Sequence, residues 1–189
     1  LAGVARRAVA PGELRWGLSF GQKIWTPEDT AARIPDPRDR PYAGWLYGAA
    51  TLLAIGQDQL SSVELQLGVV GPSALGEQVQ NTTHEALRIQ TSKGWDSQLR
   101  DEPGANLVFT RQQRGAIRLP PGELSFGWVP TLAASLGNVQ TYGAAGLMLR
   151  LGNALEADYG PPRVRPAGAG TVFFEPPEGF GWYVFAGVE

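Results

Sequence analysis

The sequence contains no cysteine and no long apolar run. Without cysteine, the 189 residues have no thiol nucleophile, no cysteine-ligated metal site and no disulfide framework. No stretch of about 18 uninterrupted apolar residues occurs, which argues against a transmembrane helix. The length suits one domain with a sizeable core.

Charge is also scarce. Charged residues make up 18% of the chain, against about 25% in typical soluble domains, and lysine occurs only at Lys23 and Lys93. The 16 basic and 18 acidic residues form no long runs and give a net charge of -2, so a nucleic-acid partner is excluded. In contrast, glycine (25) and tryptophan (6) are abundant. This composition suits a membrane β-barrel, and it also suits a glycine-rich soluble β protein.

The dominant pattern is strict alternation between apolar and other residues, which is typical of strands with two unlike faces. Several alternating segments reach about ten residues, long for a globular strand but suitable for a spanning one. The pattern predicts an all-β, antiparallel transmembrane β-barrel with an apolar outer wall, and a soluble β-sandwich stays open as the alternative. About seven strands are expected, at residues 14–21, 44–55, 62–69, 106–116, 124–136, 141–152 and from 180 onward.

Three further features refine this prediction. The inward faces are expected to carry mostly glycine, alanine and serine with scattered charge. Pro130 cannot donate to a strand ladder and is expected to mark a bulge or a strand end. Aromatic residues near the segment ends would suit an interfacial girdle, namely Trp16, Trp25, Trp45, Tyr47, Trp128 and Trp182.

Long connections are expected at residues 26–42, 71–104 and 153–169. The second of these contains the one convincing helix, predicted over residues 77–90 with Ser73 as its cap. At the start of the chain, Leu1 to Arg7 do not resemble a signal peptide. Both ends look cut, so we expect a fragment that lacks both termini.

Gln80 and His84 lie four residues apart on this helix, so their side chains share one face. Val79, Thr83, Ala86 and Leu87 supply an adjacent, less polar face. His84 is the only histidine, so histidine chemistry near neutral pH must use it. On spacing alone, the alternative is a solvated surface histidine. Neither a Ser-His-Asp triad nor a zinc motif is supported, because the chain has no second histidine and no G-x-S-x-G sequence.

Three motifs occur in a specific order: RPYAGW at residues 40–45, GPSALGEQVQNTTH at 71–84 and GWDSQLRDEP at 94–103. Together with SLGNVQTYGAAGLMLRLG at 135–152, they resemble the LpxR-type lipid A 3'-O-deacylase family of Gram-negative outer membranes. The resemblance covers nearly the whole chain.

The resemblance implies a twelve-stranded outer-membrane barrel, of which residues 1–189 would form a single partial domain. It implies Ca²⁺-dependent hydrolysis that releases the 3'-acyloxyacyl group of lipid A in the outer leaflet. His84 matches the family's catalytic histidine, Gln80 the glutamine one turn before it, and Arg40 a basic position that meets the sugar-phosphate part of the substrate. The family's Asn-Asp pair on the first strands would precede this chain, so the metal ligands stay unknown. Lipopolysaccharide and membrane lipid are the expected partners, and no protein partner is implied.

In this scheme His84 would act as general base and Ca²⁺ as a Lewis acid on the ester. The rival function is a non-enzymatic outer-membrane barrel, either a small pore or a structural envelope protein. Arg40 has the alternative of a loop salt bridge with Asp36 or Asp39, and Trp95 is expected to serve packing. The remaining carboxylates of this region could bind a cation, but they are expected to be ordinary solvated loop residues: Asp96, Asp101 and Glu102.

Overall fold

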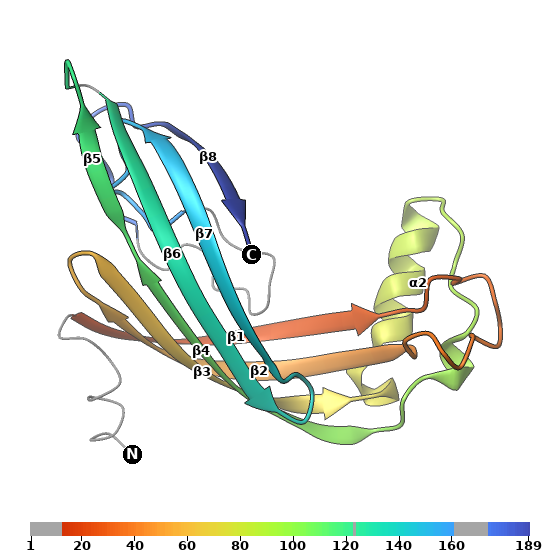
Figure 1. Cartoon of the computed structure of the whole chain (residues 1–189). Coiled ribbons are helices and arrows are strands. Elements are labelled where there is room, and N and C mark those ends of the chain that lie inside the picture. The colour runs from red at the N-terminus through yellow and green to blue at the C-terminus, as the bar shows by residue number, and fades with distance from the viewer. Residues whose placement is uncertain (1–12, 123, 161–173) are drawn as a thin grey trace.

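The structure, a computed structural model, describes residues 13–122, 124–160 and 174–189, which form one strongly bent antiparallel sheet (Figure 1). The strands pair in the order β1-β2-β3-β4-β6-β7-β8, and β5 also pairs with β6. The prediction of an antiparallel sheet is confirmed, with eight described strands rather than seven. Their bounds are β1 (Glu13–Trp25), β2 (Ala43–Ile55), β3 (Gln59–Val70), β4 (Glu102–Gln113), β5 (Gly115–Leu119), β6 (Leu124–Gly137), β7 (Tyr142–Gly152) and β8 (Tyr183–Val188).

No helix in the described part of the chain is long and apolar enough to cross a membrane. The prediction about Leu1 to Arg7 falls outside the described residues.

The two faces of the sheet differ as the alternation predicts. On β3, Glu64 and Gln66 are buried, whereas Leu65 and Leu67 point to the other side and are about half exposed. Register extends this division across the sheet, because paired residues share a face. We call the side with the buried polar residues the inner face and the opposite side the outer face. The apolar outer face is confirmed by its exposed side chains: Leu18, Phe20, Leu65, Leu67, Leu107, Leu132, Leu136, Leu147 and Leu149.

A chain of polar side chains crosses the inner face. The hydroxyl of Thr51 donates to Glu64 at 2.9 Å, and the amide of Gln66 donates to the same carboxylate. Asn106 then donates to Gln66 at 3.4 Å. These groups satisfy each other across β2, β3 and β4, as buried polar groups must. The inner face is therefore more polar than the expected glycine, alanine and serine.

The inner face of β2 corrects two predictions. Trp45 (0% exposed) and Tyr47 (8%) stack at 4.3 Å on this face, so neither belongs to an outer aromatic girdle. These two large side chains also lie where small inward-facing residues were expected from the sequence. The small residues lie instead on β1, where a β-carbon on Gly21 would fall 2.6 Å from the Tyr47 ring. Glycine on one strand thus makes room for an aromatic ring on the next. Of the other aromatics, Trp25 is partly buried, while Trp16, Trp128 and Trp182 are exposed.

Pro130 does not end its strand. β6 continues through it and stays paired with β7, where Leu147 is its partner. On the other side of β6 the ladder stops at Thr131 and resumes at Trp128 without a change of register. Pro130 therefore marks a local break between β4 and β5, because its nitrogen cannot donate.

The predicted helix is α2 (Gly76–Ala86), preceded by the short 3-10 turn η1 (Pro72–Ala74). Ser73 lies inside η1 and does not cap α2; its hydroxyl donates to Asp101 at 2.7 Å. The helix also ends four residues earlier than predicted, because Arg88 adopts a positive φ of 57°. A second short turn, η2 (Trp95–Ser97), precedes β4.

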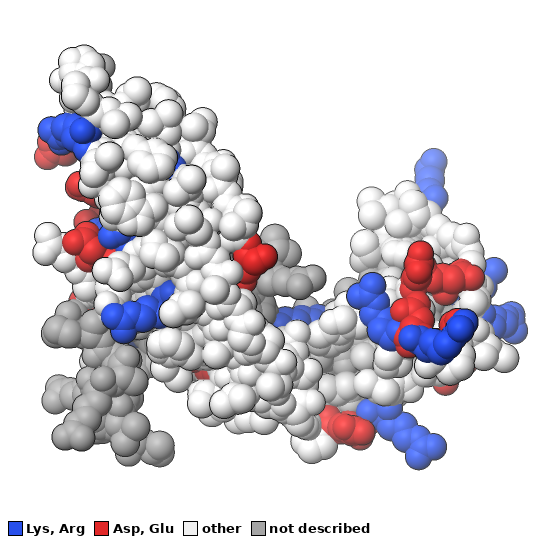
Figure 2. Space-filling model, viewed as in Figure 1, with Lys and Arg blue, Asp and Glu red and all other residues white. Residues whose placement is uncertain are grey.

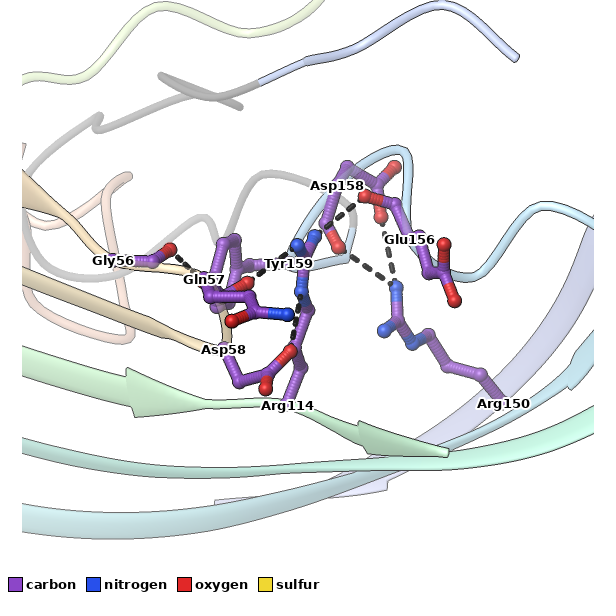
Figure 3. A network of polar contacts seen from close by, with 8 residues as sticks. All are labelled: Gly56, Gln57, Asp58, Arg114, Arg150, Glu156, Asp158 and Tyr159. Atoms are coloured by element: carbon purple, nitrogen blue, oxygen red, sulfur yellow. Dashed lines mark hydrogen bonds and ion pairs between the residues drawn. The ribbon is translucent and has the colours of Figure 1, made fainter. Parts of the chain in front are cut away.

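At the end of the sheet opposite α2, residues 153–160 form an inner loop that folds against the inner face (Figures 1 and 3). Tyr159 packs with side chains from two separate strand pairs, β2 with β3 and β6 with β7. The guanidinium of Arg114 donates to the carbonyls of Gln57 and Glu156 and lies over the Tyr159 ring. The buried core of this end comprises Leu53, Ile55, Leu60, Val129, Met148 and Tyr159.

Asp158 fastens the inner loop to the wall (Figure 3). Its carboxylate accepts from Arg150 at 2.9 Å, from the Tyr183 hydroxyl at 2.8 Å and from the Gly160 amide at 2.8 Å. Arg150 is only 1% exposed, so the Asp158 carboxylate supplies the counter-charge for a buried guanidinium.

We expect Asp158→Ala to lower the free energy of unfolding by about 3–5 kcal/mol, because it leaves the buried Arg150 charge uncompensated. Thermal unfolding followed by circular dichroism in detergent measures this. The matched control is Asp36→Ala, which removes an exposed ion pair with Arg38 and should cost no more than about 1 kcal/mol. Equal losses in the two variants would contradict the fastening role of Asp158.

Candidate functional site

The base of α2 sits directly on the outer face of the strand wall. A β-carbon on Gly44 in β2 would lie 3.1 Å from the backbone nitrogen of Gly76 and 3.2 Å from the β-carbon of Ala74. Gly44 alternates with Trp45, which points to the inner face, so this contact is on the outer side. Only glycine allows the two backbones to approach this closely.

Two polar contacts hold the base in place. On the outer face of β1, the amide of Gln22 donates to the carbonyl of Ala74 at 2.6 Å. From the far end of the same connection, Asp101 accepts from both the backbone amide and the hydroxyl of Ser73, and these bonds lower the pKa of the Asp101 carboxyl. Beyond this base α2 projects steeply across the direction of β1 and β2 (Figure 1).

Trp95 supports the helix from the wall side. It is 1% exposed, packs on Tyr42 at 4.9 Å, and would contact a β-carbon on Gly76. Its indole nitrogen donates to the side-chain oxygen of Gln80 at 3.0 Å. Trp95 therefore has the expected packing role and also fixes the amide of Gln80.

The segment after the helix folds back along α2. Asn81 exchanges two hydrogen bonds with the backbone of Ser92, at 2.8 and 3.2 Å. The ring nitrogen Nδ1 of His84 lies 2.6 Å from the carbonyl oxygen of Gln90. A carbonyl oxygen can only accept, so Nδ1 carries the proton and Nε2 of the neutral ring carries the lone pair. His84 is half-buried rather than fully solvated.

Gln80 and His84 share the face of α2 that turns toward these contacts. Within the described structure no hydrogen bond joins the two side chains, because the Gln80 oxygen is used by Trp95 and His84 Nδ1 by Gln90. Gln80 therefore does not orient the imidazole directly. Its amide group remains suited to a substrate polar group, the other role expected for it.

Arg40 lies in the connection between β1 and β2 and is exposed. Its alternative as a loop salt bridge is wrong: among the described residues, Asp36 pairs with Arg38 at 2.7 Å, and no ion pair involves Arg40. Asp39 instead accepts from the backbone amides of Glu28 and Arg40, which lowers the pKa of its carboxyl. The Arg40 charge also contributes to the lowered pKa of Asp39, but among the described residues the guanidinium forms no ion-pair contact.

Charged side chains gather at the α2 end of the molecule, whereas the neighbouring strand surface in the same view is almost uncharged (Figure 2). The hollow at this end is lined by residues of the β1–β2 connection: Pro27, Glu28, Asp29, Asp36, Arg38 and Asp39.

A metal site is not complete in the described chain. Its residues include no group of three or more histidine, aspartate or glutamate side chains that could hold an ion. Calcium prefers six to eight oxygen ligands. The described residues therefore do not fit a calcium site by themselves.

Comparisons with known proteins identify the family and the fold of the chain. A family model described as "Outer membrane protein LpxR" matches residues 2–189. The chain belongs to the LpxR family. Among solved structures, LpxR from Salmonella typhimurium is similar to it with a TM-score of 0.77 and 21% sequence identity. That match covers 92% of this chain and 59% of the Salmonella protein, and no curated protein matches. The match confirms the predicted antiparallel β-barrel fold, of which this chain spans part.

His84, Gln80 and Arg40 were proposed as site residues from the sequence, whereas the groups that position His84 and Gln80 were missed. The Gln90 carbonyl was not foreseeable, because any residue supplies a carbonyl and the back-folded segment has no periodic pattern. Gly44 and Gly76 lie inside the family motifs and gave a signal, since glycine in a strand indicates close backbone approach.

We expect the neutral His84 ring to be protonated at Nδ1 and not at Nε2, because the Gln90 carbonyl accepts from Nδ1. His84 is the only histidine, so nitrogen NMR of histidine-labelled protein gives one ring to assign. The spectrum is recorded at a pH where the ring is neutral. A ring protonated at Nε2 would contradict the arrangement.

Proposed function

We propose that this chain is part of an outer-membrane lipid A deacylase that hydrolyses the 3'-linked acyloxyacyl ester. Membership of the LpxR family supports the class of protein and its membrane. The observation that carries the proposal is the sole imidazole, held by Gln90 with Nε2 available, on a helix mounted on the outer face. Lipid in the outer leaflet would approach from that side.

His84 would act as the general base of the reaction. Nε2 accepts a proton from water as the water attacks the ester carbonyl. The positive charge that develops on the ring strengthens the bond from Nδ1 to the Gln90 carbonyl, since hydrogen bonds from charged donors are stronger. The ring then returns the proton to the sugar alkoxide as the carboxylic acid leaves. Gln90 thus does for His84 what a carboxylate does in a triad, without adding a charge.

Gln80 and Arg40 would bind the substrate. Because the Gln80 oxygen accepts from Trp95, its amide NH₂ donors are directed to other groups, such as an ester or hydroxyl oxygen of the lipid. The exposed Arg40 guanidinium presents a planar set of donors that suits a phosphate or carboxylate in bidentate geometry.

Calcium dependence is part of the proposal, and its ligands lie at least partly outside the described residues. When bound, Ca²⁺ would polarise the ester carbonyl. The roles proposed for His84, Gln80 and Arg40 do not depend on where the ion binds.

A pore is disfavoured by the inner loop. Tyr159 clusters with buried side chains of β2, β3, β6 and β7, and Asp158 binds Arg150 of β7 and Tyr183 of β8. The inner loop therefore covers the inner face of the described strands at this end. A conducting pore needs a continuous water-filled channel.

In the full-length protein, His84→Ala should lower the rate of lipid A deacylation by about 10²–10⁴-fold, the usual contribution of a general base. Mass spectrometry of lipid A measures the loss of the acyloxyacyl group. Glu85→Ala is the matched control, because Glu85 is an exposed neighbour on the same helix and should leave the rate unchanged.

Folding of both variants is checked by their mobility on unheated detergent gels. Retained activity in folded His84→Ala protein would remove the general-base role. Each assay is repeated with excess Ca²⁺ and with a chelator, and an activity indifferent to chelation would contradict the calcium proposal alone.

Arg40→Ala should reduce kcat/KM at least about tenfold through loss of a charge-assisted bond of about 1.5–3 kcal/mol. Arg40→Lys should recover only part of it, because lysine cannot bind bidentately. The control is Arg38→Ala, whose side chain already pairs with Asp36. If Arg38→Ala lowers kcat/KM as much as Arg40→Ala does, Arg40 has no special contact with the substrate.

A further inference from the structure

The two faces of α2 are reversed relative to a helix on a water-soluble protein. Its more polar residues, Gln80, Asn81 and His84, are half-buried and turned toward the back-folded segment and Trp95. The opposite face is exposed and carries two large apolar side chains, Leu75 (48% exposed) and Val79 (45%). A helix in water normally turns its apolar side to the core.

The rest of this exposed face is small and weakly polar. We call it the outer stripe of α2, and its residues recur three or four positions apart. The hydroxyl of Thr83 donates back to the carbonyl of Val79 at 2.7 Å, which leaves the Thr83 methyl group to face outward. The outer stripe comprises Leu75, Val79, Thr82, Thr83 and Ala86.

The outer stripe also continues a surface that faces lipid. Gly44 and Gln22 place the base of α2 on the outer face, the same face that carries Phe20 and Leu18 on β1. Beyond its base, α2 runs steeply across the direction of β1 and β2 and not parallel to these strands (Figure 1). An amphipathic helix with an exposed apolar stripe next to an apolar wall is typical of helices that lie in a membrane interface.

We propose that the outer stripe of α2 is buried in the acyl chains of the outer leaflet, so that α2 is an interfacial helix. Hydrocarbon is the occupant, because a continuous apolar surface is favourable there and unfavourable in water. The proposal rests on the membrane location in the proposed function and is independent of hydrolysis. Its consequence is that the membrane itself sets the depth of His84, close to the level where lipid esters lie.

The absence of cysteine makes a direct test possible. Val79→Cys in the full-length protein is labelled with an environment-sensitive fluorophore and placed in phosphatidylcholine vesicles. Some vesicles contain a phosphatidylcholine with a nitroxide on its acyl chain. We expect the Val79 label to be quenched by this lipid at least about twofold more than a label at Glu85→Cys, an exposed position on another side of α2. Aqueous iodide should show the reverse order.

A label at Leu107→Cys, on the outer face of β4, is the reference for lipid contact. If lipid nitroxide quenches Leu107 but leaves Val79 as exposed to iodide as Glu85, the interfacial helix is refuted while the membrane barrel stands. If Leu107 is not quenched either, the membrane part of the proposed function fails. A Val79→Cys protein that does not fold, as judged on unheated gels, is replaced by Thr82→Cys on the same stripe.

Discussion

The close contact between Gly44 and Gly76 is the constraint on which the site depends. It brings the backbone of α2 against the outer face of β2, so closely that a β-carbon on Gly44 would lie only 3.1 Å from the backbone nitrogen of Gly76. Gln22 reinforces the contact from β1 and Asp101 from the start of β4. The helix is therefore mounted on the outer face of the sheet, and it carries the single imidazole with it.

The site and the inner loop divide the molecule into two ends with different tasks. At the α2 end, His84 Nδ1 donates to the Gln90 carbonyl and the Trp95 indole donates to the Gln80 side-chain oxygen, which leaves His84 Nε2 and the Gln80 NH₂ group for other partners. At the other end, Asp158 and Arg150 fasten a loop across the inner face. In both places the buried charged or polar group that carries the contact has a hydrogen-bond partner, which the low dielectric of the interior makes valuable.

The fold was predictable because a strand repeats every two residues, and each one-residue slip would expose the wrong face. That rule located the outer leucines of β3, β6 and β7 and the weaker strand β4. It did not distinguish which face of β2 turns inward, since Trp45 and Tyr47 alternate with glycine and alanine and either set fits a wall. The answer came from Gly21 on the neighbouring strand, which provides the space for Tyr47. The early end of α2 was not predicted, because it depends on the positive φ of Arg88 and an arginine gives no sign of that conformation in the sequence.

For the candidate site, residue type and spacing placed His84 and Gln80 on one helix face, and the family motifs proposed roles for them and for Arg40. Their partners are backbone carbonyls and a tryptophan fifteen residues away, which leave no spacing signal. Disulfide trapping tests the mounting of α2 most directly, because the chain has no cysteine of its own. A β-carbon on Gly44 would lie 3.2 Å from that of Ala74 on the outer face, so a shift of a few tenths of an ångström brings the pair into disulfide range. Oxidation should therefore link Gly44→Cys to Ala74→Cys, but not Lys23→Cys to Ala74→Cys, because Lys23 points to the inner face. A disulfide between Lys23→Cys and Ala74→Cys, with none between Gly44→Cys and Ala74→Cys, would place α2 and His84 on the inner face and contradict the account.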